Sequence, residues 1–147
     1  MFYVMYVSSG EPLLKLVSKL KTYFQSNHDV FKESADEFVV STNAFTLRVT
    51  AYGNNVIFAS EDYSTKFEFC FWFEIIISCK SWADQLMRFV NSVLLGVEGD
   101  VVLESNGDKP ILFRRSGKLY IDKNIGDGSF PFEHITVAYE EATLERE

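Results

Sequence analysis

Cysteine and histidine are scarce in this sequence, which holds two of each among 147 residues. Cys70 and Cys79 form neither a C-x-x-C pair nor a metal-ligand spacing, and Cys70 falls within an apolar strand pattern. This scarcity excludes a zinc-finger scaffold and a disulfide-rich secreted domain. We therefore expect two free thiols in a reducing compartment, the cytoplasm.

Long apolar runs and clusters of basic residues are also missing. The longest apolar stretch, residues 69–79, is interrupted by Glu74 and is too short to cross a bilayer. Residues 1–7 lack the basic region of a signal peptide. The net charge is −7, and the Lys and Arg residues do not gather into a broad phosphate-binding surface. These absences argue against nucleic acid or membrane as a partner, whereas an acidic chain attracts basic proteins.

The local motifs of serine hydrolases, metalloproteases and nucleotide-binding enzymes are absent as well. His134 follows Glu133, but sequence neighbours on a strand point to opposite faces, and no nucleophile motif accompanies the pair. Residues 122–133 only faintly resemble a calcium loop, since Gly126 stands where the fifth ligand belongs. We therefore expect a protein that is not an enzyme, with no catalytic residue, no cofactor and no metal ligand.

Aromatic residues, in contrast, are abundant: 14 Phe, 7 Tyr and 2 Trp. Aromatic side chains pack well on a pleated surface and therefore favour a sheet. The chain is 47% hydrophobic and 24% charged, which is typical of a globular protein. The length and composition predict one domain over residues 1–139, followed by an acidic C-terminal tail over residues 140–147.

Two segments have the three- and four-residue periodicity of an amphipathic helix. The first follows Pro12, and its apolar face is Leu13, Leu16, Val17, Leu20 and Phe24. The second follows Ser81, which with Asp84 predicts a variant of the capping box. Its apolar face is Trp82, Leu86, Phe89, Val90, Val93, Leu94 and Val97.

Alternating patterns predict the strands, most clearly over residues 66–77, where Phe67, Phe69, Phe71, Phe73, Ile75 and Ile77 would share one face. Further strands are expected at residues 2–7, 37–42, 45–52, 56–60, 100–105, 111–115 and 118–122. Residues 135–139 are the candidate for a last strand. Tight turns are expected at Gly53-Asn54-Asn55, Asn106-Gly107 and Ser116-Gly117. The predicted fold class is α+β, with a mostly antiparallel sheet of about seven to eight strands and two helices packed on one face.

The second face of the long strand carries Glu68, Trp72 and Glu74. If both helices cover the phenylalanine face, this second face is open, and tryptophan among carboxylates on an open sheet suits a protein-binding patch. The alternative is a second layer of core, covered by the loop over residues 125–132.

Short segments between residues 71 and 119 resemble a known family. The segments are Phe71-Trp72-Phe73, Gly99-Asp100-Val101-Val102-Leu103, Asn106-Gly107-Asp108, Arg114-Arg115 and Gly117-Lys118-Leu119. In this order they resemble the immunity proteins of bacterial polymorphic-toxin systems, including contact-dependent growth inhibition and outer-membrane exchange. Glu104-Ser105 departs from the pattern, which has apolar residues before Asn-Gly. The resemblance implies a small cytoplasmic protein that neutralises one cognate toxin, often a nuclease.

The composition and the resemblance together predict an immunity protein that occludes the active site of a cognate, basic toxin domain. Its acidic surface would cover the cleft, with carboxylates standing in for phosphates. The alternative is an acidic secretion chaperone that binds an effector protein. The candidate toxin-binding residues lie near the expected hairpin and loop: Glu98, Asp100, Glu104, Asp108, Asp122, Asp127 and Glu133. Charge reversal at Glu104 and Asp108 is then expected to weaken binding and leave the fold intact.

Overall fold

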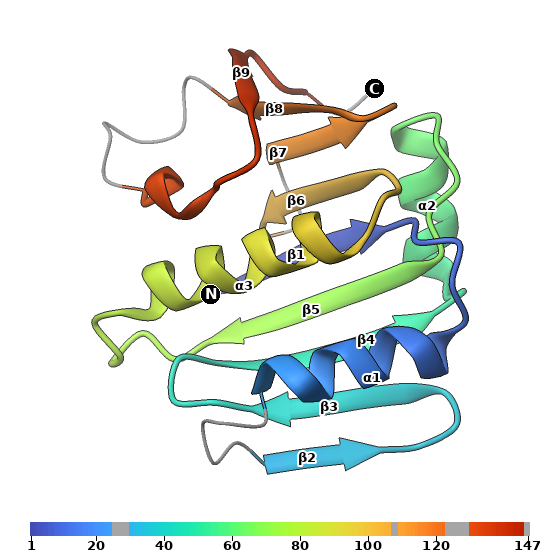
Figure 1. The fold of residues 1–147 in the computed structure, drawn as a ribbon, viewed down its shortest axis with the longest axis vertical. Coiled ribbons are helices and arrows are strands. Elements are labelled where there is room, and N and C mark those ends of the chain that lie inside the picture. The colour runs from blue at the N-terminus through green and yellow to red at the C-terminus, as the bar shows by residue number, and fades with distance from the viewer. Residues whose placement is uncertain (25–29, 107–108, 123–129, 146–147) are drawn as a thin grey trace.

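In the part of the chain that the structure describes, the protein is built on one nine-stranded sheet, which the computed structural model shows in Figure 1. Residues 1–24, 30–106, 109–122 and 130–145 are described. The strands are β1 (Phe2–Val7), β2 (Val30–Glu33), β3 (Glu37–Ser41), β4 (Phe45–Ala51), β5 (Phe69–Ile75), β6 (Val101–Ser105), β7 (Pro110–Arg115), β8 (Lys118–Asp122) and β9 (Tyr139–Ala142). Their order is β2-β3-β4-β5-β1-β6-β7-β8-β9, and every neighbouring pair is antiparallel except β8–β9. The predicted α+β class and the mostly antiparallel sheet are therefore confirmed.

The phenylalanine row of β5 anchors the main core, as predicted, although the strand is shorter than expected. Phe69, Phe71 and Phe73 are almost completely buried in the larger apolar cluster. Phe67 instead joins a second cluster on the other side, and Ile77 is 65% exposed. The prediction was wrong for these two residues because β5 spans only Phe69–Ile75, so the alternation does not extend to them.

Helices α1 (Leu13–Phe24) and α3 (Trp82–Gly96) cover the phenylalanine face, in front of the sheet in Figure 1. Both were predicted, and the buried side of each is the predicted apolar stripe. The Phe89 ring of α3 lies 5.1 Å from the Phe24 ring of α1 and 5.8 Å from the Phe73 ring of β5. This aromatic contact joins the two helices to the sheet.

A third helix, α2 (Asn54–Asp62), replaces the strand expected at residues 56–60 and the turn expected at residues 53–55. Val56, Ala59 and Tyr63 are buried at helical spacing, and Gly53 begins the helix in an extended conformation. A short, mostly apolar run of five residues fits a strand and a helix equally well, which explains the error. The helix packs on the opposite face, against Tyr6, Cys70 and Val102.

The two edge strands also differ from the prediction. Strand β2 was not expected, whereas the last strand is Tyr139–Ala142 rather than residues 135–139. The short 3-10 helix η2 (Phe132–His134) packs against α3, and Ile135, the next residue, is buried in the main core. The first residues of the predicted tail are therefore a strand, parallel to β8.

Gly99 and Arg114, both part of the motif that resembles immunity proteins, join α3 to the sheet. A side chain at Gly99 would lie 1.5 Å from the backbone oxygen of Ser8, so only glycine fits there. The Arg114 guanidinium donates to the backbone oxygens of Leu94 (2.7 Å), Val97 and Gly99 (3.0 Å), which are at and just beyond the end of α3. Burial lowers the pKa of Arg114, and the nearby Asp100 carboxylate opposes that shift. The motif thus secures the end of the helix.

Both cysteines are free thiols, as expected. Cys70 is buried beneath α2, whereas Cys79 is only partly buried. Burial, with a smaller effect from the Glu104 carboxylate, raises the pKa of the Cys70 thiol to about 12. Cys70 is therefore an unreactive packing residue at neutral pH.

Replacing Phe69 or Phe71 with Ala should reduce the free energy of unfolding by ~3–5 kcal/mol, because each removes a fully buried ring. Urea denaturation provides the measurement. Ile77→Ala is the control, since its exposed side chain should change stability by less than ~0.5 kcal/mol. A loss below ~1 kcal/mol for both phenylalanine variants would contradict the assignment of this face as the core.

Thiol labelling should distinguish the two cysteines. At pH 8 a disulfide reagent should modify Cys79 in the folded protein, and Cys70 should react only after denaturation. Two rapidly reacting thiols in the folded protein would show that α2 does not cover Cys70.

The buried Cys70 thiol should also make the stability of the fold depend on pH. Because folding raises the Cys70 pKa from its ordinary 9.0 to about 12, the contribution of the neutral thiol to stability is complete below pH 9.0 and is lost as pH rises toward 12.

Candidate partner-binding site

Two of the acidic candidates, Glu104 and Asp122, lie in the interior rather than on a binding surface. Glu104 is 0% exposed and accepts a hydrogen bond from the hydroxyl of Tyr63, the residue that follows α2. Asp122 is 2% exposed, pairs with the Lys109 ammonium at 3.1 Å, and accepts the backbone N–H of Leu144 at 3.3 Å. These carboxylates hold structural elements together. A charge reversal at Glu104 would therefore damage the fold, contrary to our expectation from the sequence.

The other acidic candidates do not converge on one surface. Asp100 is half-buried, where its carboxylate accepts from the Ser116 backbone N–H (2.9 Å) and from the Thr65 hydroxyl. Glu98 is exposed beyond the C-terminal end of α3, whereas Glu133 is exposed beside its first turn. A 15-residue helix is about 22 Å long, so these two carboxylates are far apart. Asp108 and Asp127 lie outside the described residues.

An open hollow of about 370 Å³ lies on the second face of the sheet, beside the start of α2. The pairing of β4 with β5 forms its floor, because Arg48 lies opposite Trp72 and Thr46 opposite Glu74. Its lining residues are Thr46, Arg48, Thr50, Asn55, Cys70, Trp72 and Glu74. The second face is thus partly core under α2 and partly open. The loop expected to cover it lies mainly outside the described residues.

The polar and aromatic side chains of this hollow are held in place before any partner arrives. The Trp72 ring stacks on Phe2, with ring centroids 4.5 Å apart and planes at 10°. The Trp72 indole N–H donates to the Glu74 carboxylate at 3.0 Å, and the Arg48 guanidinium donates to Glu37 at 2.6 Å. Side chains that are already ordered lose little conformational entropy when a partner binds.

Beside the hollow, α2 and the turn before it expose three large apolar side chains. Tyr52, Ile57 and Phe58 are 68%, 51% and 60% exposed. Tyr52 and Ile57 line an adjoining shallow groove of about 440 Å³ together with Val56 and Phe67. Large apolar side chains exposed on one element and beside a groove are typical of sites that bind proteins. The sequence pattern does not indicate this surface, because residues 56–60 were predicted to form a strand.

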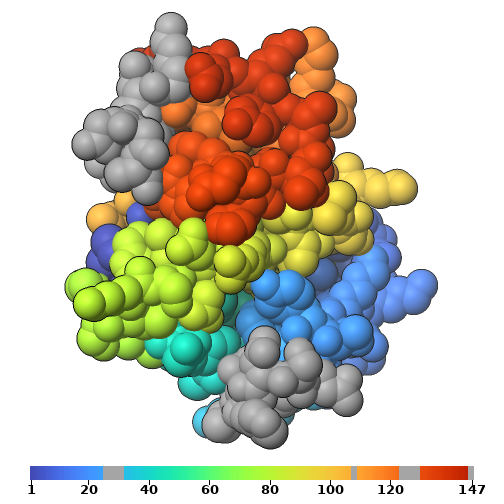
Figure 2. All heavy atoms as spheres, turned by 60° about the vertical axis from the view of Figure 1, so that its left-hand side comes forward, coloured from blue at the N-terminus to red at the C-terminus, as the bar shows by residue number. Residues whose placement is uncertain are grey.

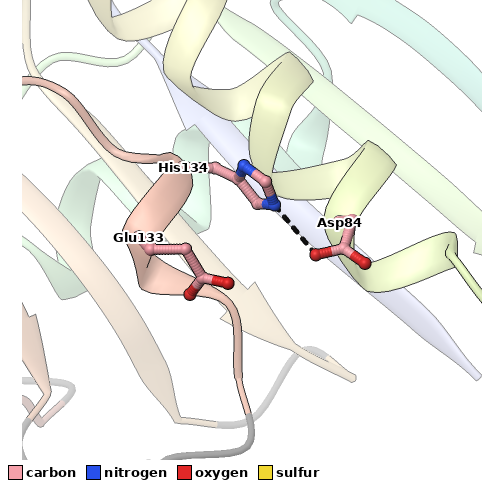
Figure 3. A group of neighbouring side chains, drawn as sticks. All are labelled: Asp84, Glu133 and His134. Carbon is pink, nitrogen blue, oxygen red and sulfur yellow. Dashed lines mark hydrogen bonds and ion pairs between the residues drawn. The ribbon is translucent and has the colours of Figure 1, made fainter.

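A separate polar cluster, shown in Figure 3, joins η2 to the first turn of α3. His134 Nε2 lies 2.8 Å from Asp84 Oδ1, and the Glu133 carboxylate completes a group whose donor atoms lie within 4.8 Å of one another. The predicted capping box is absent: Ser81 makes no side-chain cap, and Asp84 pairs with His134 instead. No sequence signal connects these residues, which are 50 positions apart.

The described residues include no helix long and apolar enough to cross a membrane. No curated protein and no solved structure matches the chain. The profile of the family described as SitI3-like matches residues 6–128, which extend from β1 past β8 and include the open hollow. The SitI families consist of immunity proteins of polymorphic-toxin systems. Because the match spans well over half of the sequence, the chain belongs to the SitI3-like family.

Proposed function

We propose that this protein is an immunity protein that binds one cognate toxin domain and covers its active site. The contact surface in this proposal is the open face around Trp72, together with the exposed outer side of α2. The observation that carries it is the pairing of membership in an immunity family with a preformed aromatic surface on the sheet. Inhibition then requires binding alone, without a chemical step.

The composition of the open face supports a protein as its ligand. Tryptophan, tyrosine and arginine are the residues most enriched at the energetic centres of protein interfaces, and Trp72, Tyr52 and Arg48 occur together here. The Arg48–Glu37 ion pair and the Trp72–Glu74 hydrogen bond hold the polar groups of the hollow in place in the free protein. A partner can therefore dock on an ordered platform at low entropic cost.

The charge of the chain supports a basic toxin, and we propose a nuclease. A net charge of −7 attracts a positively charged nucleic-acid cleft and accelerates association. Because Glu104 and Asp122 are buried, this attraction comes from the surface as a whole, while the aromatic patch supplies the contact. We propose the cytoplasm as the site of action, where the two free thiols stay reduced.

The variants Trp72→Ala and Arg48→Ala should each weaken toxin binding. We expect a loss of ~2 kcal/mol or more for Trp72→Ala, which is about 30-fold in Kd, since the truncation removes the aromatic surface on which the toxin packs. Toxin genes usually adjoin their immunity genes, so a toxin domain encoded next to this gene is the partner to use for calorimetry, accompanied by melting curves. Arg48 is exposed, so its variant keeps the fold even if Trp72→Ala does not.

The matched control is Tyr139→Ala, which removes another exposed aromatic ring from the distant edge strand β9. Its affinity for the toxin should equal that of the wild type. Unchanged affinity in both test variants would eliminate the open face as the contact. If the neighbouring toxin does not bind at all, the immunity function is wrong, and binding of a secreted effector becomes the function to test.

A further inference from the structure

The cluster of Asp84, Glu133 and His134 unites three metal-ligating side chains from two separate elements (Figure 3). Asp84 belongs to the first turn of α3, and the other two residues belong to η2. Asp84 and His134 are partly buried, whereas Glu133 is exposed. The cluster lies on the helix side of the sheet, because α3 packs on the phenylalanine face, whereas the open face proposed to bind the toxin is on the other side.

The packing around the cluster fixes where these groups meet. Figure 2 shows the C-terminal segment in orange-red packed against α3 in lime and yellow. About two turns further along α3, Asn91 exchanges two hydrogen bonds with Thr136, at 3.0 and 3.1 Å. Ile135, immediately after His134, is buried in the main core. The backbone that follows His134 is therefore held against α3, which keeps the two elements of the cluster in contact.

We propose that Asp84, Glu133 and His134 bind one divalent transition-metal ion, for which Zn²⁺ is the best match. One imidazole nitrogen with two carboxylate oxygens is a donor set that Zn²⁺ accepts, whereas Mg²⁺ and Ca²⁺ prefer oxygen donors alone. Three protein ligands leave the fourth tetrahedral position to water. The ion replaces the direct contact of His134 with Asp84 as the link between η2 and α3.

The present spacing is close to what coordination requires. Ligand bonds of about 2.0–2.1 Å in a tetrahedron separate the donor atoms by about 3.3 Å. The distance between His134 Nε2 and Asp84 Oδ1 must therefore increase slightly from 2.8 Å. The most distant pair of donor atoms, which lie within 4.8 Å of each other, must come closer, and rotation of the exposed Glu133 side chain can achieve this. The N-terminus of α3 opposes a cation with roughly half a unit of positive charge, but the two carboxylates outweigh it with two negative charges.

A bound ion would close a loop of 50 residues between Asp84 and His134. A ligand that binds only the folded protein raises the melting temperature in proportion to the logarithm of its concentration. The bound ion would therefore cross-link η2, and the segment that leads to β9, to helix α3.

Calorimetric titration of the full chain with zinc chloride tests this proposal, with magnesium chloride titrated in parallel. We expect one Zn²⁺ per chain, a melting temperature that rises with zinc concentration, and no comparable effect of Mg²⁺. The variants His134→Asn and Glu133→Gln should each lower the zinc affinity at least ~10-fold. Glu133 is exposed, so its variant tests the site even if His134→Asn destabilises the protein.

Two matched controls separate this site from nonspecific zinc binding. His28→Asn removes the other histidine of the chain, and Glu98→Gln removes an exposed carboxylate beyond the opposite end of α3. Both should bind zinc as the wild type does. The proposal is wrong if zinc does not bind, if the controls lose as much affinity as the test variants, or if Mg²⁺ binds as tightly as Zn²⁺. Each of these outcomes leaves the proposed toxin binding untouched.

Discussion

The alternation of side chains on β5 is the constraint on which the other contacts depend. A shift of one residue in its pairing would turn the phenylalanine row outward and bury Glu74 and Trp72 instead. The rings of Phe69, Phe71 and Phe73 are fully buried, so such a shift would remove the largest side chains from the core. The register of β5 with β1 and β4 is therefore fixed, and with it the face that each neighbouring strand presents to the helices.

This constraint gives the two faces of the sheet different roles. Helices α1 and α3 cover the phenylalanine face, and Arg114 ties the end of α3 to β7. On the second face, α2 covers only one part, where Tyr63 bonds to the buried Glu104. The remainder keeps Trp72 and Arg48 accessible on a surface that the core beneath makes rigid. A rigid, partly open sheet is suited to binding one partner with a defined shape.

The sequence predicted those parts of the fold whose periodicity continues over many residues. Periodicity predicted the apolar stripes of α1 and α3 and the alternation of β5. A turn signal between the two strands predicted the pairing of β6 with β7. Helix α2 was not, because residues 56–60 are too few to distinguish a period of two from one of 3.6. Where short segments pack depends on tertiary contacts, which local patterns do not record.

The candidate site could be predicted only in part, for the same physical reason. Alternation placed Trp72 and Glu74 on the second face, but it could not show that α2 covers Cys70 and leaves Trp72 accessible. The local sequence around Glu104 predicts a surface carboxylate. Its burial depends on Tyr63, which is 41 residues away and therefore outside any local pattern. The meeting of His134 with Asp84 likewise requires the chain to return to α3 after residue 130.

Backbone hydrogen exchange of the protein, free and bound to its cognate toxin, would locate the contact surface. On complex formation we expect new protection in β4, β5 and α2, around the open face that carries Trp72. The helix layer of α1 and α3 should exchange as it does in the free protein. Protection concentrated on α1 and α3, with none around Trp72, would contradict the claim that the open sheet face is where the toxin binds.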